Sequence, residues 1–224
     1  MSNIIIENLY KSYNTGTEKL LILKNLNLTV EPNTRVILTG SSGSGKSTLL
    51  NLISGMDNIS SGKILVDNYN VHKLDENTLS SFRALSIGLI FQFHYLLKDF
   101  TALENVMMPA YMTGMPKAAA LAKARELIVE VGLEARMNHL PSQLSGGEKQ
   151  RIAVVRSMIN NPGIILADEP TGNLDEANSI KVEEILFELV NKHGKTLVLV
   201  THDNSLATRG DRHLKLENGI LVEL

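Results

Sequence analysis

The chain has 224 residues, of which 43% are hydrophobic and 21% are charged, as is ordinary for a soluble globular protein with one core. The formal charge of −2 gives no basic field that would favour nucleic acid, and the lack of cysteine excludes disulfides and thiolate metal sites. No apolar run approaches the ~18 residues of a membrane span, and the first residues, MSNIIIENLYK, carry no basic leader. We therefore expect a cytoplasmic protein that reaches a membrane only through a partner.

Apolar strands alternate with helices along the chain. The expected strands are residues 3–10, 21–30, 35–40, 62–68, 86–92 and 163–170, then 195–203 and a closing hairpin at 213–224. The expected helices are residues 46–55, 101–114, 117–132, 146–161 and 176–194. This alternation predicts an α/β fold whose parallel sheet is covered on both faces. The helical run predicts a subdomain at residues 93–160, inserted into a single domain whose α/β core and β subdomain take residues 1–92 and 161–224.

The loop GSSGSGKST fits the phosphate-binding pattern G-x-x-x-x-G-K-[ST]. Its glycines let backbone N–H groups wrap around phosphate oxygens, and the following helix points its positive end at the same anion. Lys46 is expected to reach the β and γ phosphates, and the Ser47 hydroxyl to bind Mg²⁺. A chance resemblance is the alternative, but the strand before and the helix after supply the context that the motif requires. The expected contacts are Gly40, Ser41, Ser42, Gly43, Ser44, Gly45, Lys46, Ser47 and Thr48.

Polar residues stand at the ends of three other predicted strands, where ligands bind in open α/β sheets. Asp168 is expected to hold Mg²⁺, and Glu169 to polarise the attacking water or take its proton. His202 follows another buried strand and could donate to the γ-phosphate and order Glu169. Gln92 could touch Mg²⁺ or the water. The alternative for each is an ordinary polar strand end, which is less favoured beside the glycine loop.

A second glycine turn, LSGGEKQR, opens a predicted helix about a hundred residues downstream. Ser145, Gly146 and Gly147 offer N–H groups, a hydroxyl and a helix dipole, which suit an anion. The alternative is an ordinary capping box of Ser145 with Glu148. One nucleotide does not need two phosphate cradles from one chain. We therefore expect a head-to-tail homodimer in which each Ser145 turn closes over the nucleotide of the other chain.

The order of GSSGSGKST, Gln92, LSGGE, ILADEP, GNLD and His202 resembles the ATP-binding subunit of an ABC transporter over essentially the whole chain. The resemblance implies a RecA-like P-loop core with a small antiparallel β subdomain and a helical subdomain. It also implies ATP hydrolysis at a closed dimer interface, with Asn173, Leu174 and Asp175 at that interface and Tyr13 stacked on adenine. Glu148 stands where many members have glutamine.

Two stretches, FQFHYLLKDFTALENVMMP and NNPGIILADEPTGNLD, are most similar to the lipoprotein-releasing subfamily. Macrolide-exporter and cell-division relatives share much of the same sequence. A soluble ABC ATPase acting on DNA or ribosomes is an alternative of another class. Such chains usually carry a long coiled coil, zinc fingers or a second ATPase domain, which this sequence lacks. A GTPase-type switch would need an N-K-x-D base reader, which is also missing.

Large apolar side chains gather near the start of the helical subdomain. Five Phe and five Tyr make up the aromatic residues, and six of these ten fall between residues 82 and 111: Phe82, Phe91, Phe93, Tyr95, Phe100 and Tyr111. Met107, Met108, Met112 and Met115 follow closely. A subdomain core would also use such residues, but adaptable apolar grooves favour them as well. We expect the 93–111 region to dock integral-membrane permease subunits, through Tyr95, Leu96, Phe100 and Met108.

Overall fold

The computed structural model describes residues 3–14, 16 and 18–224, and its centre is a six-stranded sheet in the order β10-β9-β3-β8-β7-β6. The strands are β3 (Arg35–Thr39), β6 (Ile87–Ile90), β7 (Ile164–Asp168), β8 (Thr196–Val200), β9 (Arg212–Glu217) and β10 (Ile220–Glu223). Strands β6, β7, β8, β3 and β9 are parallel to their neighbours, and β10 is antiparallel to β9. Nearly every residue of β3, β7 and β8 is buried, because both faces of the sheet are covered.

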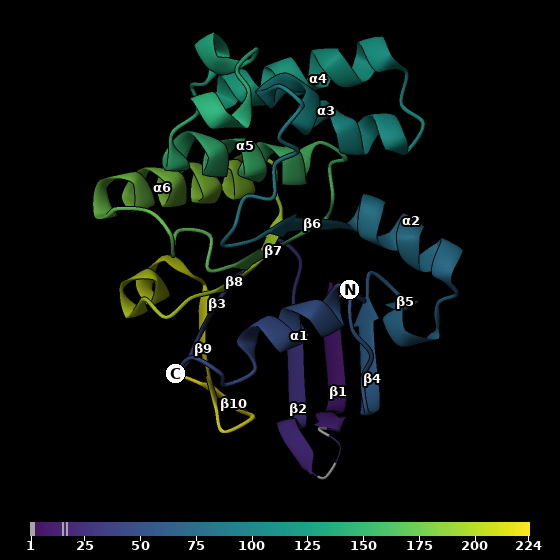
Figure 1. Ribbon diagram of the computed structural model, residues 1–224. Helices are drawn as coiled ribbons and strands as arrows, with labels where there is room; N and C mark the ends of the chain where they lie inside the picture. The colour runs from purple at the N-terminus through teal and green to yellow at the C-terminus, as the bar shows by residue number, and fades with distance from the viewer. Residues whose placement is uncertain (1–2, 15, 17) are drawn as a thin grey trace.

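A second, four-stranded sheet has the order β2-β1-β4-β5 and is antiparallel throughout. Its strands are β1 (Ile4–Asn14), β2 (Lys19–Val30), β4 (Ser61–Val66) and β5 (Tyr69–Asn70). Alternating side chains of β1 and β2, among them Ile4, Ile6 and Leu28, enter the core, as the period of two in the sequence predicts. Figure 1 shows this sheet below the helix α1.

Helices cover the two faces of the central sheet. They are α1 (Lys46–Ile53), α2 (Glu76–Ser86), α3 (Ala102–Met112), α4 (Lys117–Glu130), α5 (Gly146–Met158) and α6 (Glu176–Lys192), with four short 3₁₀ helices at Val71–Lys73, Glu134–Arg136, Pro141–Gln143 and Asn204–Arg209. Figure 1 shows α5 and α6 above the sheet, with α3 and α4 as a further layer, and α1 beneath it. The two faces have separate hydrophobic clusters, since Ile37 and Ile165 pack towards α5 and α6 whereas Leu38 and Leu166 pack towards α1 and β1.

The expected strands and helices form, so the predicted α/β fold is confirmed, with three local differences. The sequence analysis missed α2, which begins where the Asp75 carboxylate accepts a hydrogen bond from the N–H of Thr78. It also missed the short strand β5. Strand β6 ends at Ile90, whose partner on β7 is Ala167, so Gln92 lies in the loop beyond the sheet. Among the described residues, no helix is both long and apolar enough to cross a membrane.

Candidate functional site

Three loops begin side by side at one edge of the central sheet. Leu38 of β3 pairs with Val200 of β8, and Val200 pairs in turn with Asp168 of β7. Just beyond the strands, the N–H of Thr201 donates to the carbonyl of Leu38 over 3.1 Å, and the N–H of Glu169 donates to the carbonyl of Val200 over 2.9 Å. This register brings the glycine loop, the two acids and the segment of His202 together.

The glycine loop is shaped by backbone angles that other residues rarely adopt. Gly43 and Gly45 have φ of 77° and 104°. A Cβ at Gly45 would lie 2.9 Å from Cγ2 of Ile22, so the loop also packs too closely on β2 for a side chain there. The Lys46 Nζ is buried and donates to the carbonyls of Gly40 and Ser41, each over 2.9 Å. Gly45 gives α1 no side-chain cap, so the first N–H groups of the helix face the loop.

Asp168 offers an oxygen suited to a hard cation. Its Oδ1 is buried and has no hydrogen-bond partner in the described part of the chain. Burial raises the pKa of this carboxyl, although a hydrogen bond from Ser47 and the charge of Lys46 act in the opposite direction. No group of three His, Asp or Glu residues among the described residues could hold a metal alone. Mg²⁺ commonly binds through one carboxylate and phosphate oxygens, which is what Asp168 and Ser47 leave room for.

Glu169 and His202 form a pair at the same edge. The Oε2 of Glu169 lies 3.0 Å from Nδ1 of His202, and Glu169 has an unusual φ of 44°. A Cβ at Gly172 would lie 2.9 Å from Nε2 of Gln92 and 3.3 Å from Oε2 of Glu169, so both side chains approach this glycine. The structure thus brings Glu169, His202 and Gln92 together.

Gln92 has a partner that the sequence analysis did not identify. Its Nε2 donates to Oδ1 of Asn173 over 3.2 Å, and Nδ2 of Asn173 donates back to the carbonyl of Gln92 over 3.2 Å. The loop after β6 is therefore tied to the loop after β7. Gln92 was expected near Mg²⁺ or the attacking water, and the resemblance placed Asn173 at the dimer interface, but their sequence separation of 81 gave no sign of the contact.

The second glycine turn is a capping box at the start of α5. The Oγ of Ser145 accepts a hydrogen bond from the N–H of Glu148 over 3.2 Å, and the Glu148 carboxylate accepts one from the N–H of Ser145 over 2.8 Å. A serine hydroxyl keeps one hydrogen to donate while it accepts such a bond, so capping and anion binding are compatible. Among the described residues, no hydrogen bond or ion pair joins this turn to the glycine loop of the same chain.

The turn packs on the segment that follows β7. A Cβ at Gly147 would lie 2.7 Å from Oδ1 of Asn178, and one at Gly146 would lie 3.1 Å from Leu174, so a side chain at either position would displace its neighbour. Asp175 caps α6 by accepting from the N–H of Asn178 over 3.0 Å. Leu174 and Asp175, which the resemblance places at a dimer interface, thus lie beside the Ser145 turn.

Arg136 is a neighbour of the turn that sequence reasoning missed. Its Nε lies 2.9 Å from Oε1 of Glu148. The hydrogen bond from the N–H of Ser145 and this guanidinium outweigh burial and hold the pKa of the Glu148 carboxyl below its usual range. A charged carboxylate at a turn that would receive phosphate is therefore offset by a cation at the same place.

Comparison with known proteins agrees with this geometry. A sequence profile of the ABC transporter family matches residues 23–172. A solved dimer of the ATP-binding cassette MJ0796, in a post-hydrolysis state bound to ADP and Pi, has a TM-score of 0.90 and 39% identity, over 99% of this chain and 97% of that one. A dimeric MJ0796 structure described as a bacterial ABC transporter cassette has a TM-score of 0.89 and 40% identity, over 97% of this chain and 96% of that chain.

The glycine loop, the acidic strand end and the second glycine turn define a P-loop nucleotide hydrolase, and the chain belongs to the ABC transporter family as an ATP-binding, ATP-hydrolysing subunit. Within the family it is similar to proteins named as the lipoprotein-releasing system ATP-binding protein LolD. The protein of Treponema denticola is 52% identical over 99% of this chain and 98% of its own length, and that of Legionella pneumophila (strain Lens) is 46% identical over 99% and 98%. The expected family is thus confirmed.

Replacing Glu169 tests its role as the base in ATP hydrolysis. Glu169→Gln keeps the side-chain shape but removes the carboxylate that could take a proton. We expect ATP to bind, ATP-bound dimers to accumulate and hydrolysis to fall by about 10²–10⁴. Phosphate release and size-exclusion chromatography with ATP measure these effects. Glu188→Gln, an exposed change on α6, is the matched control and should behave like the unchanged protein. Near-normal turnover of Glu169→Gln would rule out this role.

The buried carboxylate of Asp168 should make the stability of the fold depend on pH. Because burial raises its folded-state pKa, its charge destabilises the fold above the unfolded-state pKa, and this cost is relieved as pH falls through the folded-state value. Asp168→Asn removes the charge, so without nucleotide we expect a higher Tm near pH 7.5, by ~2–4 °C for each kcal/mol relieved. The gain should shrink as pH falls, and Mg²⁺ should no longer aid nucleotide binding. Thermal melts against pH, with the exposed Asp99→Asn as control, check this. A Tm lowered at all pH values would contradict it.

Proposed function

We propose that this chain hydrolyses ATP in a head-to-tail homodimer on the cytoplasmic face of the inner membrane and drives a permease that releases lipoproteins. The observation that carries the ATPase part is the meeting of the glycine loop, Asp168 and the Glu169–His202 pair at one sheet edge. The lipoprotein part is supported by the name of the relatives, such as the LolD protein of Treponema denticola at 52% identity.

In this proposal the phosphates lie in the glycine loop, held by its N–H groups and by Lys46. Tyr13 stacks on the adenine. Ser47, Asp168 and Gln92 would hold Mg²⁺, which would offset negative charge on the phosphates. Glu169 polarises the attacking water and accepts its proton.

His202 orients that base. A ring protonated on Nδ1 donates to Oε2 of Glu169 across 3.0 Å, which restrains the carboxylate on one side. The Nε2 edge then faces away from Glu169 and is available to the γ-phosphate. Asn173 holds Gln92 through two hydrogen bonds, so Gln92 is restrained on the other side of Gly172.

The Ser145 turn serves the nucleotide of the second chain. Its N–H groups, its hydroxyl and the start of a 13-residue helix suit an anion, and Arg136 offsets the carboxylate of Glu148. Among the described residues, no hydrogen bond or ion pair ties the turn to the glycine loop of its own chain. Two-fold pairing of one surface then gives two equal composite sites.

Mixing two defective chains tests the composite site. Ser145→Arg should leave nucleotide binding to the monomer nearly unchanged, because Lys46 and the glycine loop remain, while hydrolysis collapses. Lys46→Ala should also be inactive. A heterodimer of the two holds one site with both lesions and one with neither, so phosphate release should return in mixtures. The exposed neighbour Ser142→Arg is the control and should keep its activity. Mixtures that dimerise but stay inactive would count against composite sites.

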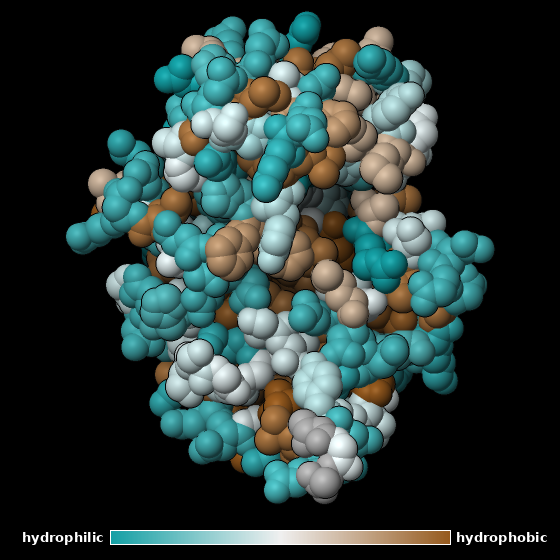
Figure 2. Space-filling view, in the orientation of Figure 1, coloured by the Kyte–Doolittle hydropathy of each residue, from teal (hydrophilic) through white to brown (hydrophobic). Residues whose placement is uncertain are grey.

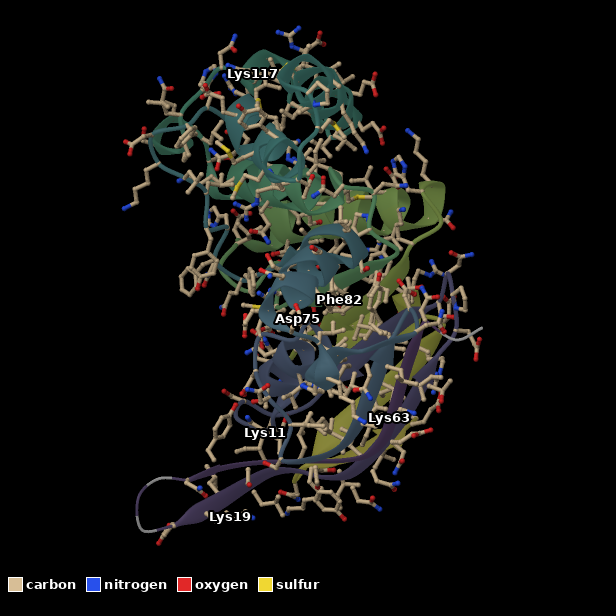
Figure 3. The ribbon with its side chains drawn as sticks, turned by 90° about the vertical axis from the view of Figure 1, so that its right-hand side faces the viewer. Lys11, Lys19, Lys63, Asp75, Phe82 and Lys117 are labelled. Atoms are coloured by element: carbon tan, nitrogen blue, oxygen red, sulfur yellow. The ribbon has the colours of Figure 1, made fainter. Side chains whose placement is uncertain are left out.

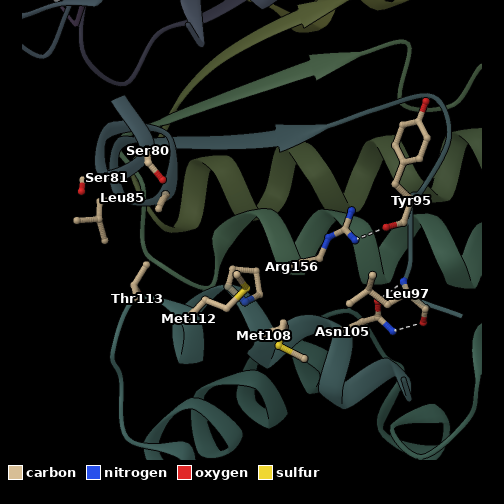
Figure 4. A pocket seen from close by; sticks show the side chains of 12 residues that line it. Ser80, Ser81, Leu85, Tyr95, Leu97, Asn105, Met108, Met112, Thr113 and Arg156 are labelled. Carbon is tan, nitrogen blue, oxygen red and sulfur yellow. Dashed lines mark hydrogen bonds between the residues drawn. The ribbon is translucent and has the colours of Figure 1, made fainter. Parts of the chain in front are cut away.

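The permease would dock in a groove of about 630 Å³ between α2, α3 and α5. Figure 2 shows a hollow with hydrophobic atoms between the helical layer and the sheets, and Figure 4 shows the lining side chains from close by. Tyr95 and Met108 line the groove, as expected, and so do Leu97, Met112 and Arg156. Leu96 lines a neighbouring cavity instead, and Phe100 lines neither. Phe82 and Met107 are buried core residues.

The groove has an apolar wall with one cation at its base. The two terminal nitrogens of Arg156 donate to the carbonyls of His94 and Tyr95, each over 2.7 Å, and Figure 4 shows the bond to Tyr95. Met112 is 78% exposed and Tyr95 is 65% exposed, so large apolar side chains remain open to a partner. A short amphipathic helix of the permease fits such a surface.

A charge placed in the groove should release the permease. Met108→Glu introduces a carboxylate among apolar walls, so we expect loss of stoichiometric co-purification with the membrane subunits and basal ATP hydrolysis near that of the unchanged protein. Met56→Glu, at an exposed methionine outside this groove, is the matched control and should keep the complex. A Met108→Glu chain that is folded and still co-purifies would show that this groove is not the docking site.

A further inference from the structure

A buried cation lies against the ring of Tyr13. Lys11 and Tyr13 stand two residues apart on β1, and Nζ of Lys11 is 4.4 Å from the centre of the Tyr13 ring. The Lys11 side chain is only 7% exposed, and its Nζ forms an ion pair with Asp57 at 2.7 Å and donates to the carbonyl of Asn58 over 2.6 Å. Figure 3 shows Lys11 in the lower part of the molecule, above Lys19 near the start of β2. Two protein oxygens thus hold the ammonium in place.

The same carboxylate holds the hydroxyl of Tyr13. The Tyr13 hydroxyl donates to Oδ2 of Asp57 over 2.6 Å, while Oδ1 accepts from Lys11. Burial opposes the charge, but the hydrogen bonds from Lys11 and Tyr13 hold the pKa of the Asp57 carboxyl below its usual range. Asp57 is therefore a charged acceptor shared by both side chains, and such bonds are among the stronger ones in proteins.

These contacts join the Tyr13 ring to the helix of the glycine loop. Asp57 follows α1, and its N–H donates to the carbonyl of Asn51 inside that helix over 3.3 Å. The ring on β1 and the phosphate loop at the start of α1 are thus fixed relative to each other.

The ring is ordered but still accessible. Tyr13 is 39% exposed although its hydroxyl and the Lys11 side of the ring are occupied. An aromatic ring that is already ordered loses little conformational entropy when a base stacks on it, so stacking is stronger than on a freely rotating side chain. The ammonium is occupied by Asp57 and Asn58, which leaves the ring, rather than Lys11, to meet a ligand.

We propose that Lys11 and Asp57 are positioning residues that hold the Tyr13 ring for base stacking and so set how tightly this site binds its nucleotide. The inference rests on the proposed contact between Tyr13 and the base. It assigns to a buried ion pair of the β subdomain a part in nucleotide binding, separate from the hydrolytic chemistry at the sheet edge.

The split between KM and kcat is the measurement that separates positioning from folding. The full chain carrying Asp57→Asn, Tyr13→Phe or Tyr13→Ala is assayed for kcat and KM with ATP and with GTP. We expect Asp57→Asn and Tyr13→Phe to raise KM for ATP by about 3–10-fold, the size of the net contribution of one typical hydrogen bond, with kcat within about twofold. KM for GTP should rise by a similar factor, because every base can stack on the ring. In a Tyr13→Ala background, Asp57→Asn should add no further change in KM.

Two controls match these changes. Asp211→Asn breaks another Asp ion pair, with Arg35 at 2.6 Å, and Tyr10→Phe removes the hydroxyl of another partly exposed tyrosine of β1. Both should leave KM for ATP and for GTP unchanged. If Asp57→Asn does not fold, Tyr13→Phe still decides, because it removes a single hydroxyl.

The outcomes separate this inference from the proposed function. If Tyr13→Ala raises KM for ATP but Asp57→Asn and Tyr13→Phe do not, the positioning role fails and adenine stacking stands. If Tyr13→Ala itself leaves KM unchanged, the proposed adenine contact fails, and the positioning role fails with it. An Asp57→Asn effect that persists in the Tyr13→Ala background, or that lowers only Tm, also overturns the inference.

Discussion

Parallel hydrogen bonding between β3, β8 and β7 is the constraint on which the candidate site depends. Because Leu38, Val200 and Asp168 lie in register, the three segments that follow them start at the same edge. Asp168, Glu169 and His202 are all more than 100 residues away in sequence from the glycine loop that they meet. A shift of one residue in any of these pairings would turn the side chains of that strand to the opposite face and separate the groups. These strands are apolar along their length and buried on both faces, so the sheet edge that carries the site is supported by packing from both sides.

The site combines a well-packed strand with two groups that are unfavourable for the stability of the fold. Asp168 has a buried oxygen without a protein partner, and Glu169 adopts a backbone conformation that is unfavourable for a residue with a side chain. Both groups lie at the end of β7, and the packing of this largely buried strand holds them in position. The same pattern occurs at the second glycine turn, where Asn178 leaves no space for a side chain at Gly147.

Local patterns predicted most of the fold and the glycine loop, because strands, caps and P-loops have short-range signals. Helix α2 was missed because few of its apolar side chains are buried. Phe82 is the only fully buried residue of that helix. The partners of the site were missed for a different reason. The contacts of Gln92 with Asn173, and of Lys11 with Asp57, join residues 81 and 46 apart in sequence, where no periodic pattern reports proximity. For Ser145 the residue pattern allowed either a cap or an anion site, and the observed geometry admits both.

Helix α5 has one end at the groove and the other at the second glycine turn. Near one end of the helix, Arg156 donates hydrogen bonds to the carbonyls of His94 and Tyr95 at the base of the groove. At the other end, Ser145 begins the glycine turn. At the rise of an α-helix these points are about 16 Å apart, so a tilt of ~5° about the groove would carry the turn by ~1.4 Å. Hydrogen-bond lengths vary by only about 0.5 Å, so a displacement of this size would make or break a hydrogen bond to an anion at the turn. A force applied at the groove would thus make or break a hydrogen bond at the second glycine turn.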